Sequence, residues 1–281
     1  MNTSQTNKLH PQIAPMLNAG DKSAMDTLSA PKAGHVVIAM CADARMPSGT
    51  TPQRKRQELD ALPGQMIVTI DGPARSGKNT AGELVAEAIG GVLVDSGRFY
   101  RSLTAAVLRV GINLNDAEAV GQFCSQALIY VPLDRDGGSV IEAIVAVNGR
   151  WYSKAEVNAV GAATPKVADV PQARELVNSA LHLLNGWGRM VMLGRDIGAR
   201  VFPETPFKIF LNAPAHVLEK RHRKTTGMPG AEKRNLADRK NTIRAEGALE
   251  IDTSISQPSA VCDAILAHLL RCARSDKNVA H

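Results

Sequence analysis

A glycine-rich turn, set between a short apolar run and a helical segment, most constrains what this chain can fold into. Met66–Asp71 is short, apolar and β-branched, which predicts a buried strand. Ala81–Ile89, beyond the turn, carries apolar residues at helical spacing. In such a strand–turn–helix unit, glycines let consecutive backbone N–H groups point at one anion, and the helix start adds the positive end of its dipole. The turn is therefore predicted to bind phosphate.

The turn has the pattern Gly-x-x-x-x-Gly-Lys, in which the lysine reaches the outer phosphates of a nucleoside triphosphate. Here that lysine is Lys78, followed by Asn79 and Thr80. Most such loops place Ser or Thr directly after the lysine, whereas nucleoside monophosphate kinases commonly read Gly-Lys-Gly-Thr, which matches the position of Thr80. We expect ATP to bind here with its Mg²⁺ near Thr80. The residues expected to contact the nucleotide are Gly72, Pro73, Ala74, Arg75, Ser76, Gly77, Lys78, Asn79 and Thr80.

The order of the apolar runs indicates the fold class. Four further runs have the length and composition of buried strands: Val92–Asp95, Arg189–Gly194, Phe207–Asn212 and Ala248–Asp252. Helical segments separate them, which favours an α/β fold with a five-stranded parallel sheet flanked by helices, of P-loop NTPase type. A hairpin around Asp136-Gly137-Gly138 predicts a small insert over about residues 125–185. The core domain should span residues 66–274, with a flexible tail over 275–281.

Residues 1–65 differ from the rest of the chain. Polar stretches with Pro and Gly surround one apolar island, His35–Met40, and a charged stretch, Gln53–Asp60, follows. We interpret this region as a largely disordered extension whose removal leaves activity intact.

Composition excludes several classes of protein. No apolar run approaches the roughly 18 residues that a membrane span needs. The 4 cysteines are too few for a disulfide framework, which favours a reducing, cytoplasmic setting. We expect a monomer with no membrane partner.

The positive charge of the chain is concentrated in one segment. The chain has 33 Lys and Arg against 27 Asp and Glu, a formal net charge of +6. Basic residues gather between Lys220 and Arg244, where there is no Phe, Tyr or Trp. A nucleic-acid surface typically interleaves aromatic residues with cations, so we do not expect a nucleic-acid partner. A mobile basic lid over about residues 220–244, which stabilises charge on a transferring phosphoryl group and excludes water, explains the segment better.

Two arginine-containing segments follow predicted strands and are candidates for a second anion site. Asp95–Arg101 follows one strand, and Gly194–Gly198 follows another. The carboxyl ends of parallel strands share one edge of the sheet, where ligands bind. Arg101 could clamp a phosphate with Ser96 as a hydrogen-bonding partner, and Arg195 lies beside the carboxylate of Asp196.

Taken together, these motifs resemble the bacterial cytidylate kinase family over roughly residues 66–270. The most specific are Ile70-Asp71-Gly72-Pro73, Asp95-Ser96-Gly97 and Gly194-Arg195-Asp196-Ile197-Gly198. The resemblance implies transfer of the γ-phosphoryl group of ATP to CMP or dCMP, giving ADP and CDP or dCDP, with Mg²⁺. It implies catalytic roles for Lys78, Arg195, Asp196 and Arg221, and binding of the acceptor by Ser96, Tyr100, Arg101, Arg195, Asp196 and Arg244.

Three departures from the family pattern keep other functions open. The loop has Ala74, Arg75 and Asn79, so two usual glycines are lost and we expect its backbone to manage without positive φ there. Ser153-Lys154 stands where the family has Ile-Arg-Thr, and Asn241 replaces an acid of a shortened lid. The alternatives are a kinase for another monophosphate or a small-molecule acceptor, and a non-catalytic nucleotide-binding protein of the same fold.

Overall fold

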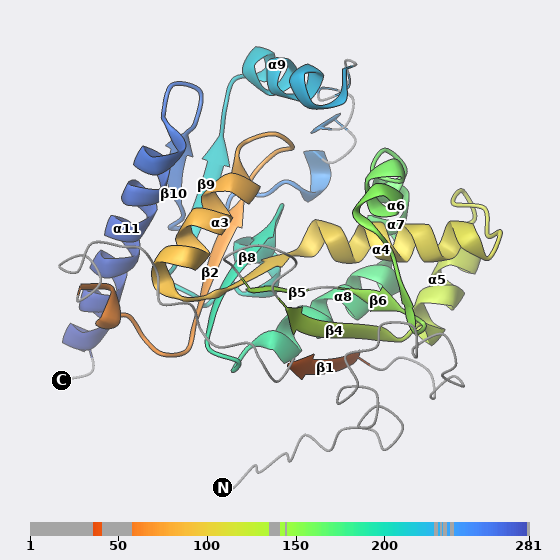
Figure 1. The fold of residues 1–281 in the computed structure, drawn as a ribbon, viewed down its shortest axis with the longest axis horizontal. Helices are drawn as coiled ribbons and strands as arrows, with labels where there is room; N and C mark the ends of the chain where they lie inside the picture. Colours follow the sequence, from red (N-terminus) through yellow and green to blue (C-terminus); the bar gives the residue numbers. More distant parts are fainter. Residues whose placement is uncertain are drawn as a thin grey trace, which may run out of the picture.

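The computed structural model describes residues 36–40, 58–134, 141–143, 145–227, 230, 232, 235, 236 and 239–279. At its centre lies a parallel sheet in the order β10–β9–β2–β8–β3 (Figure 1). The bounds of these strands are β2 Met66–Asp71, β3 Val92–Asp95, β8 Arg189–Gly194, β9 Lys208–Asn212 and β10 Leu249–Asp252. The five predicted strands and the α/β fold class are thus confirmed.

The alternation of side chains along β8 explains why both faces of the sheet are covered. Met190 and Met192 point to one face, where they pack with α4 (Ser96–Arg109) and α8 (Pro171–Leu184). Val191 and Leu193 point to the other, where α3 (Lys78–Ile89) and α11 (Pro258–Val279) complete the core. All four side chains are buried. A strand that is apolar on both faces needs helices on both sides, as the sequence pattern predicted.

The predicted insert continues the main sheet beyond β3. Strands β5 (Ile141–Ala143), β4 (Ile129–Asp134), β6 (Ala146–Val147) and β7 (Arg150–Trp151) follow β3 in order. β5 pairs parallel with β3, and β4 pairs antiparallel with both β5 and β6. The predicted turn of the hairpin, residues 136–138, lies outside the described residues.

Short helices complete the insert. They are α5 (Ala117–Gln126), α6 (Lys154–Ala159) and α7 (Thr164–Ala168). A capping box between Ser153 and Glu156 starts α6. Figure 1 shows α6, α7 and α9 (Ala215–Thr226) toward the same end of the molecule, where the central strands end.

The predicted domain boundary at Met66 falls too late. Leu59 and Leu62 are 2% and 3% exposed and belong to the core beneath α3 and α11. Arg189 fastens the same segment, donating to the carbonyl oxygens of Leu62 at 2.8 Å and Pro63 at 3.0 Å. Charged residues lie next to the two leucines in the sequence, so no apolar pattern predicted their burial.

A strand also forms farther upstream, within the predicted disordered extension. β1 (Val36–Met40), the apolar island, pairs parallel with β4. Residues 1–35 and 41–57 lie outside the described residues, so disorder remains a prediction for them alone.

The helix at the other end of the chain is longer than predicted. α11 continues past Arg274 to Val279, which corrects the predicted flexible tail up to that residue, while Ala280 and His281 lie outside the described residues. Among the described helices, none is both long enough and apolar enough to cross a lipid bilayer.

Two truncations, both of which remove β1, test the contribution of Leu59 and Leu62 to the fold. A chain starting at residue 58 keeps the buried leucines, whereas one starting at residue 66 loses them. Full burial of one leucine stabilises a fold by about 1.5–3 kcal/mol, so we expect the shorter chain to have a Tm lower by ~6 °C or more. Thermal unfolding of the two chains tests it, and equal Tm values would contradict it.

Candidate active site

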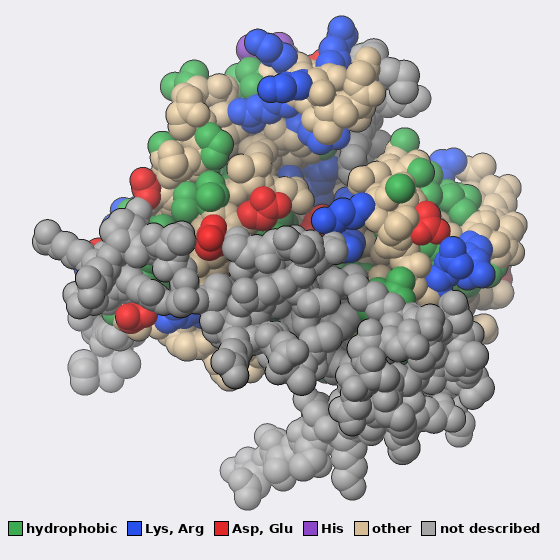
Figure 2. Space-filling model, viewed as in Figure 1, with side chains coloured by type: hydrophobic (Ala, Val, Ile, Leu, Met, Phe, Trp, Pro, Cys, Tyr) green, Lys and Arg blue, Asp and Glu red, His purple; other side chains and the backbone are tan. Residues whose placement is uncertain are grey.

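A pocket of about 450 Å³ opens at the carboxyl ends of β2, β3 and β8. Its walls come from the phosphate loop, the start of α4, the insert helices, the turn after β8 and α9. Figure 2 shows the hollow below α9, with Lys and Arg side chains on α9 and inside the hollow. The predicted site residues that line it are Ala74, Arg75, Gly77, Lys78, Asn79, Thr80, Ser96, Tyr100, Arg101, Arg195, Asp196 and Arg221.

Carbonyl oxygens of the phosphate loop fix the position of the Lys78 ammonium group. The Nζ atom of Lys78 donates to the carbonyl oxygens of Gly72 at 2.8 Å and Pro73 at 2.7 Å. Gly77 has a φ of 93° where the loop turns into α3. Ser76 is buried, while Asn79 and Thr80 are exposed on the pocket wall. The lysine ammonium group therefore lies where the loop curves around its ligand position.

Arg75 takes a backbone conformation that glycine usually occupies, with a φ of 67°. Our expectation that the loop manages without positive φ at this point is wrong. The loop keeps its left-handed turn, at a conformational cost of about 1–3 kcal/mol for a residue with a side chain. Burial lowers the pKa of the Arg75 guanidinium, whose Nε atom lies 3.4 Å from Nδ1 of His222 on α9.

The start of α4 builds the second cationic wall. The carboxylate of Asp95 caps the helix by accepting from the Gly97 amide at 2.9 Å, and it pairs with Arg101 Nη2 at 2.9 Å. Burial alone would raise the pKa of Asp95, but Arg101 and the Gly97 amide together hold that pKa below its usual value. The Ser96 hydroxyl donates to the Leu193 carbonyl at 2.7 Å. Burial raises the pKa of Tyr100 to about 12, so its phenol stays neutral.

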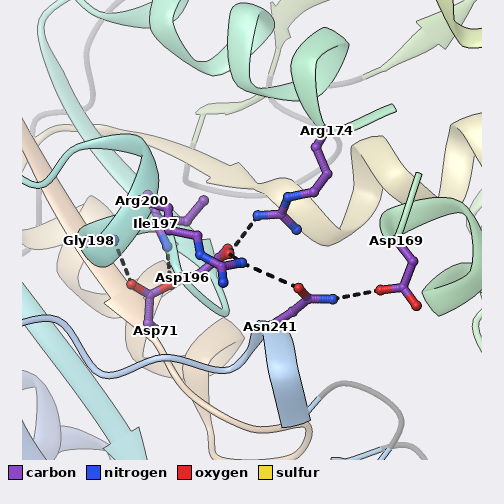
Figure 3. Close-up of polar contacts among 8 residues, drawn as sticks. All are labelled: Asp71, Asp169, Arg174, Asp196, Ile197, Gly198, Arg200 and Asn241. Carbon is purple, nitrogen blue, oxygen red and sulfur yellow. Dashed lines mark hydrogen bonds and ion pairs between the residues drawn. The ribbon is translucent and has the colours of Figure 1, made fainter. Parts of the chain in front are cut away.

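The turn after β8 carries a charged network (Figure 3). Asp196 is 6% exposed and accepts from Arg174 Nη2 at 2.6 Å and Arg200 Nη1 at 3.1 Å. Arg195 Nη1 donates to the Gly72 carbonyl at 3.1 Å, which ties this turn to the phosphate loop.

The basic segment lies over the phosphate loop. Arg221 of α9 donates through Nη1 to the Arg75 carbonyl at 3.2 Å and to the Thr253 hydroxyl at 2.9 Å. Farther along, the side-chain oxygen of Asn235 accepts from the Ala74 amide at 2.7 Å. A loop amide is thus presented to an acceptor oxygen, as phosphate binding requires.

Asp71, at the end of β2, faces the same turn from below. It is 2% exposed, and its oxygens accept from the backbone amides of Ile197 at 2.9 Å and Gly198 at 2.8 Å (Figure 3). Burial raises the pKa of Asp71 to about 6, with Asp196 adding to the rise and Lys78 opposing it. At neutral pH the carboxylate is ionised and satisfied by these amides.

This pKa has a measurable consequence for stability. The pKa of Asp71 in the fold, about 6, lies above its ordinary value of 3.8, so the folded state binds the proton more tightly. We expect the free energy of unfolding, relative to that of Asp71→Asn, to rise by about 2 kcal/mol as the pH falls from about 7 to about 4. Urea unfolding of both proteins across this range measures the difference. A difference independent of pH would contradict the burial of an ionised carboxylate.

Four predicted site residues are not among the lining residues of the pocket, namely Gly72, Pro73 and Ser76 of the loop and Arg244, and other lining residues were missed. Arg244 is not among the lining residues; it pairs with Glu250 on the edge strand β10, because the chain after the lid runs almost directly into that strand. The sequence analysis missed Arg174, Asn178 and Asn158, which line the pocket from the insert helices. Arg174 and Asn178 are four residues apart, which places them on one side of α8. The sequence shows this spacing, but it does not show that this side of the helix faces the pocket.

No metal site is assembled by side chains alone in the described part of the chain. No group of three or more His, Cys, Asp or Glu residues there could hold a metal ion.

The pocket is a cationic cavity that combines a phosphate loop with arginines on the other elements of its wall. This arrangement is suited to two phosphorylated ligands.

Comparisons with known proteins agree with this geometry. The family model "Cytidylate kinase" matches residues 68–271. A cytidylate kinase of Mycolicibacterium paratuberculosis is 33% identical over 210 residues, which cover 73% of this chain and 88% of that protein. Cytidylate kinases of Roseiflexus castenholzii and Chloroflexus aggregans are 33% and 34% identical, covering 69% and 71% of this chain and 83% and 84% of their own. The chain therefore belongs to the cytidylate kinase family.

Proposed function

We propose that this protein transfers the γ-phosphoryl group of ATP to CMP or dCMP, releasing ADP and CDP or dCDP. The observation that carries the proposal is one pocket whose wall contains Lys78 of the phosphate loop together with Arg101 and Arg195. Membership of the cytidylate kinase family supports the choice of acceptor.

The donor nucleotide would bind on the loop side. The amides of Ala74 to Gly77 and the ammonium group of Lys78 would hold the phosphates of ATP, and Arg221 approaches the loop from α9. Phosphoryl transfer needs charge stabilisation on the equatorial oxygens more than it needs covalent chemistry. Lys78 and Arg221, which both contact carbonyl oxygens of the loop, can supply that charge.

The acceptor would bind between α4, α8 and the turn after β8. Arg101 and Arg195 are suited to its phosphate, because guanidinium groups form paired hydrogen bonds with phosphate oxygens. Arg174 and Asp196, paired at 2.6 Å, form the wall behind them and would hold the nucleoside. The two phosphate groups would then meet in front of Lys78.

The loop also fits an ATP-borne Mg²⁺. Thr80 contributes an exposed hydroxyl to the pocket wall, and a hydroxyl is an oxygen ligand of the kind that Mg²⁺ takes beside phosphates and water. Thr80 would hold the metal directly or through water. When bound, Mg²⁺ neutralises negative charge on the phosphates of ATP.

An acceptor screen tests the proposal. ADP release from ATP and Mg²⁺ is measured with the purified full chain and one acceptor at a time. We expect CMP or dCMP to stimulate release at least ~10-fold more than UMP, AMP or shikimate.

The other outcomes identify the alternatives. Stimulation mainly by a different compound would indicate a kinase for another acceptor. ATP binding with no stimulation by any acceptor would indicate a non-catalytic nucleotide-binding protein. Either result would overturn the proposed function.

A further inference from the structure

We propose that Asp71 is a positioning residue, whose carboxylate fixes the turn that carries Arg195 and Asp196 in the acceptor half of the pocket. The inference rests on the proposed function, since it assigns Asp71 a part in that reaction. Asp71 itself is absent from the pocket wall and is 2% exposed. It must therefore act through the residues it holds.

The turn needs an external hydrogen-bond acceptor. Ile197–Val201 is a π-helical turn, η2, in which the Phe202 amide donates to the Ile197 carbonyl at 2.8 Å. The first amides of any helical turn lack partners within it. Asp196, at the N-cap position, does not cap the turn with its side chain. Asp71 reaches across from β2 and accepts from the Ile197 and Gly198 amides at 2.9 and 2.8 Å (Figure 3).

The turn packs so closely against β2 that side chains larger than glycine do not fit at Gly194 and Gly198. A Cβ atom added to Gly198 would lie 2.6 Å from the Thr69 hydroxyl and 3.4 Å from Asp71 Oδ2. A Cβ atom on Gly194 would lie 2.3 Å from the side chain of Ile197. The glycines let the turn sit directly on the strand, so the carboxylate sets its height and orientation.

Both charged residues of the turn depend on this placement. Asp196 directly precedes Ile197, and it fixes Arg174 and Arg200 through ion pairs at 2.6 and 3.1 Å. Arg195 reaches the Gly72 carbonyl, and Gly72 directly follows Asp71 in the chain. The carboxylate thus joins the start of the donor loop to the start of the acceptor wall, and it couples the two halves of the pocket.

The burial of this charge fits a role beyond folding. A buried carboxylate disfavours the fold unless hydrogen bonds compensate it, and the raised pKa of Asp71 indicates that compensation is incomplete. The charged groups facing it are Asp196 from the turn and Lys78 from α3. A group that costs stability and touches no ligand is expected where function needs a fixed geometry.

The test uses Asp71→Asn, which keeps the size of the side chain. An amide has one acceptor oxygen, so its NH₂ group must face the second backbone N–H and the turn shifts. We expect kcat/KM for CMP to fall at least ~30-fold, through both a lower kcat and a higher KM, with the Kd for ATP changed less than ~3-fold. Faster exchange of the Ile197 and Gly198 amides, measured by NMR, should accompany the loss.

Thr69→Val is the matched control. It changes a β2 side chain that lies against Gly198 of the turn, and it leaves the Asp71 carboxylate unchanged. The Thr69 hydroxyl is buried, and within the described residues it has no hydrogen-bond partner. Its replacement should therefore leave kinetics and amide exchange close to those of the wild type.

Three outcomes would overturn the proposal. They are Asp71→Asn with near wild-type kinetics, equal losses for ATP and CMP that follow a lower Tm, and unchanged exchange of the two amides. A wild-type protein that phosphorylates no acceptor would instead overturn the proposed function, and amide exchange would still decide whether Asp71 holds the turn.

Discussion

Lys78→Ala should lower kcat for phosphorylation of CMP at least ~10²-fold, because it removes the charge that we propose stabilises the transferring phosphoryl group. The Nζ atom of Lys78 already lies within the curve of the loop, 2.8 and 2.7 Å from the carbonyl oxygens of Gly72 and Pro73. Steady-state kinetics with saturating ATP and CMP measure the loss.

Lys208→Ala is the matched control for this prediction. Lys208 is the first residue of β9, so it lies toward the amino ends of the strands, away from the pocket at their carboxyl ends. It is not among the residues that line the pocket. We expect its replacement to leave kcat within ~2-fold of the wild type. A folded Lys78→Ala protein with near-normal kcat would contradict the role given to the loop.

Arg101→Met should raise the KM for CMP and lower kcat/KM for CMP at least ~30-fold, with little change in the Kd for ATP. Arg101 lines the acceptor half of the pocket, with its side chain 18% exposed and paired with Asp95 at 2.9 Å. Hydrogen bonds to a charged group contribute about 1.5–3 kcal/mol each, and methionine preserves the apolar length of the side chain. Initial rates over a range of CMP concentrations, with calorimetry of ATP binding, separate the two effects.

Arg109→Met, on the same helix, controls for removal of a positive charge from α4. Arg109 is the last residue of α4, is exposed and lies outside the pocket. Its replacement should change neither constant. An Arg101→Met protein that loses ATP affinity as much as CMP activity would place this arginine on the donor side and contradict its assignment.

The fold was predictable because each core strand has its own local signal. Short β-branched runs such as Val92–Asp95 lie between helical segments, and this order leaves few arrangements other than a covered parallel sheet. The burial of Leu59 and Leu62 in the core was not predictable in the same way. Two apolar residues among charged neighbours make no periodic pattern, and only the completed core shows what they cover.

The site was predictable where function depends on local backbone geometry. The phosphate loop is one continuous turn, so its sequence specifies its place, and Lys78 lies where the motif puts it. Arg174 comes to the pocket through the crossing of α8 over the sheet, which no local pattern encodes. The φ of Arg75 was mispredicted because steric preference was weighed alone, whereas the surrounding loop imposes the left-handed turn.

The central claim is that one pocket holds two nucleotides with their phosphates facing each other. Calorimetry with adenosine and cytidine joined through a chain of phosphates, in the presence of Mg²⁺, tests it most directly. We expect one site per chain, displacement by ATP and by CMP, and binding at least ~10²-fold tighter than that of either nucleotide, because the link makes the second contact intramolecular. Binding no tighter than that of ATP, with no displacement by CMP, would contradict the claim.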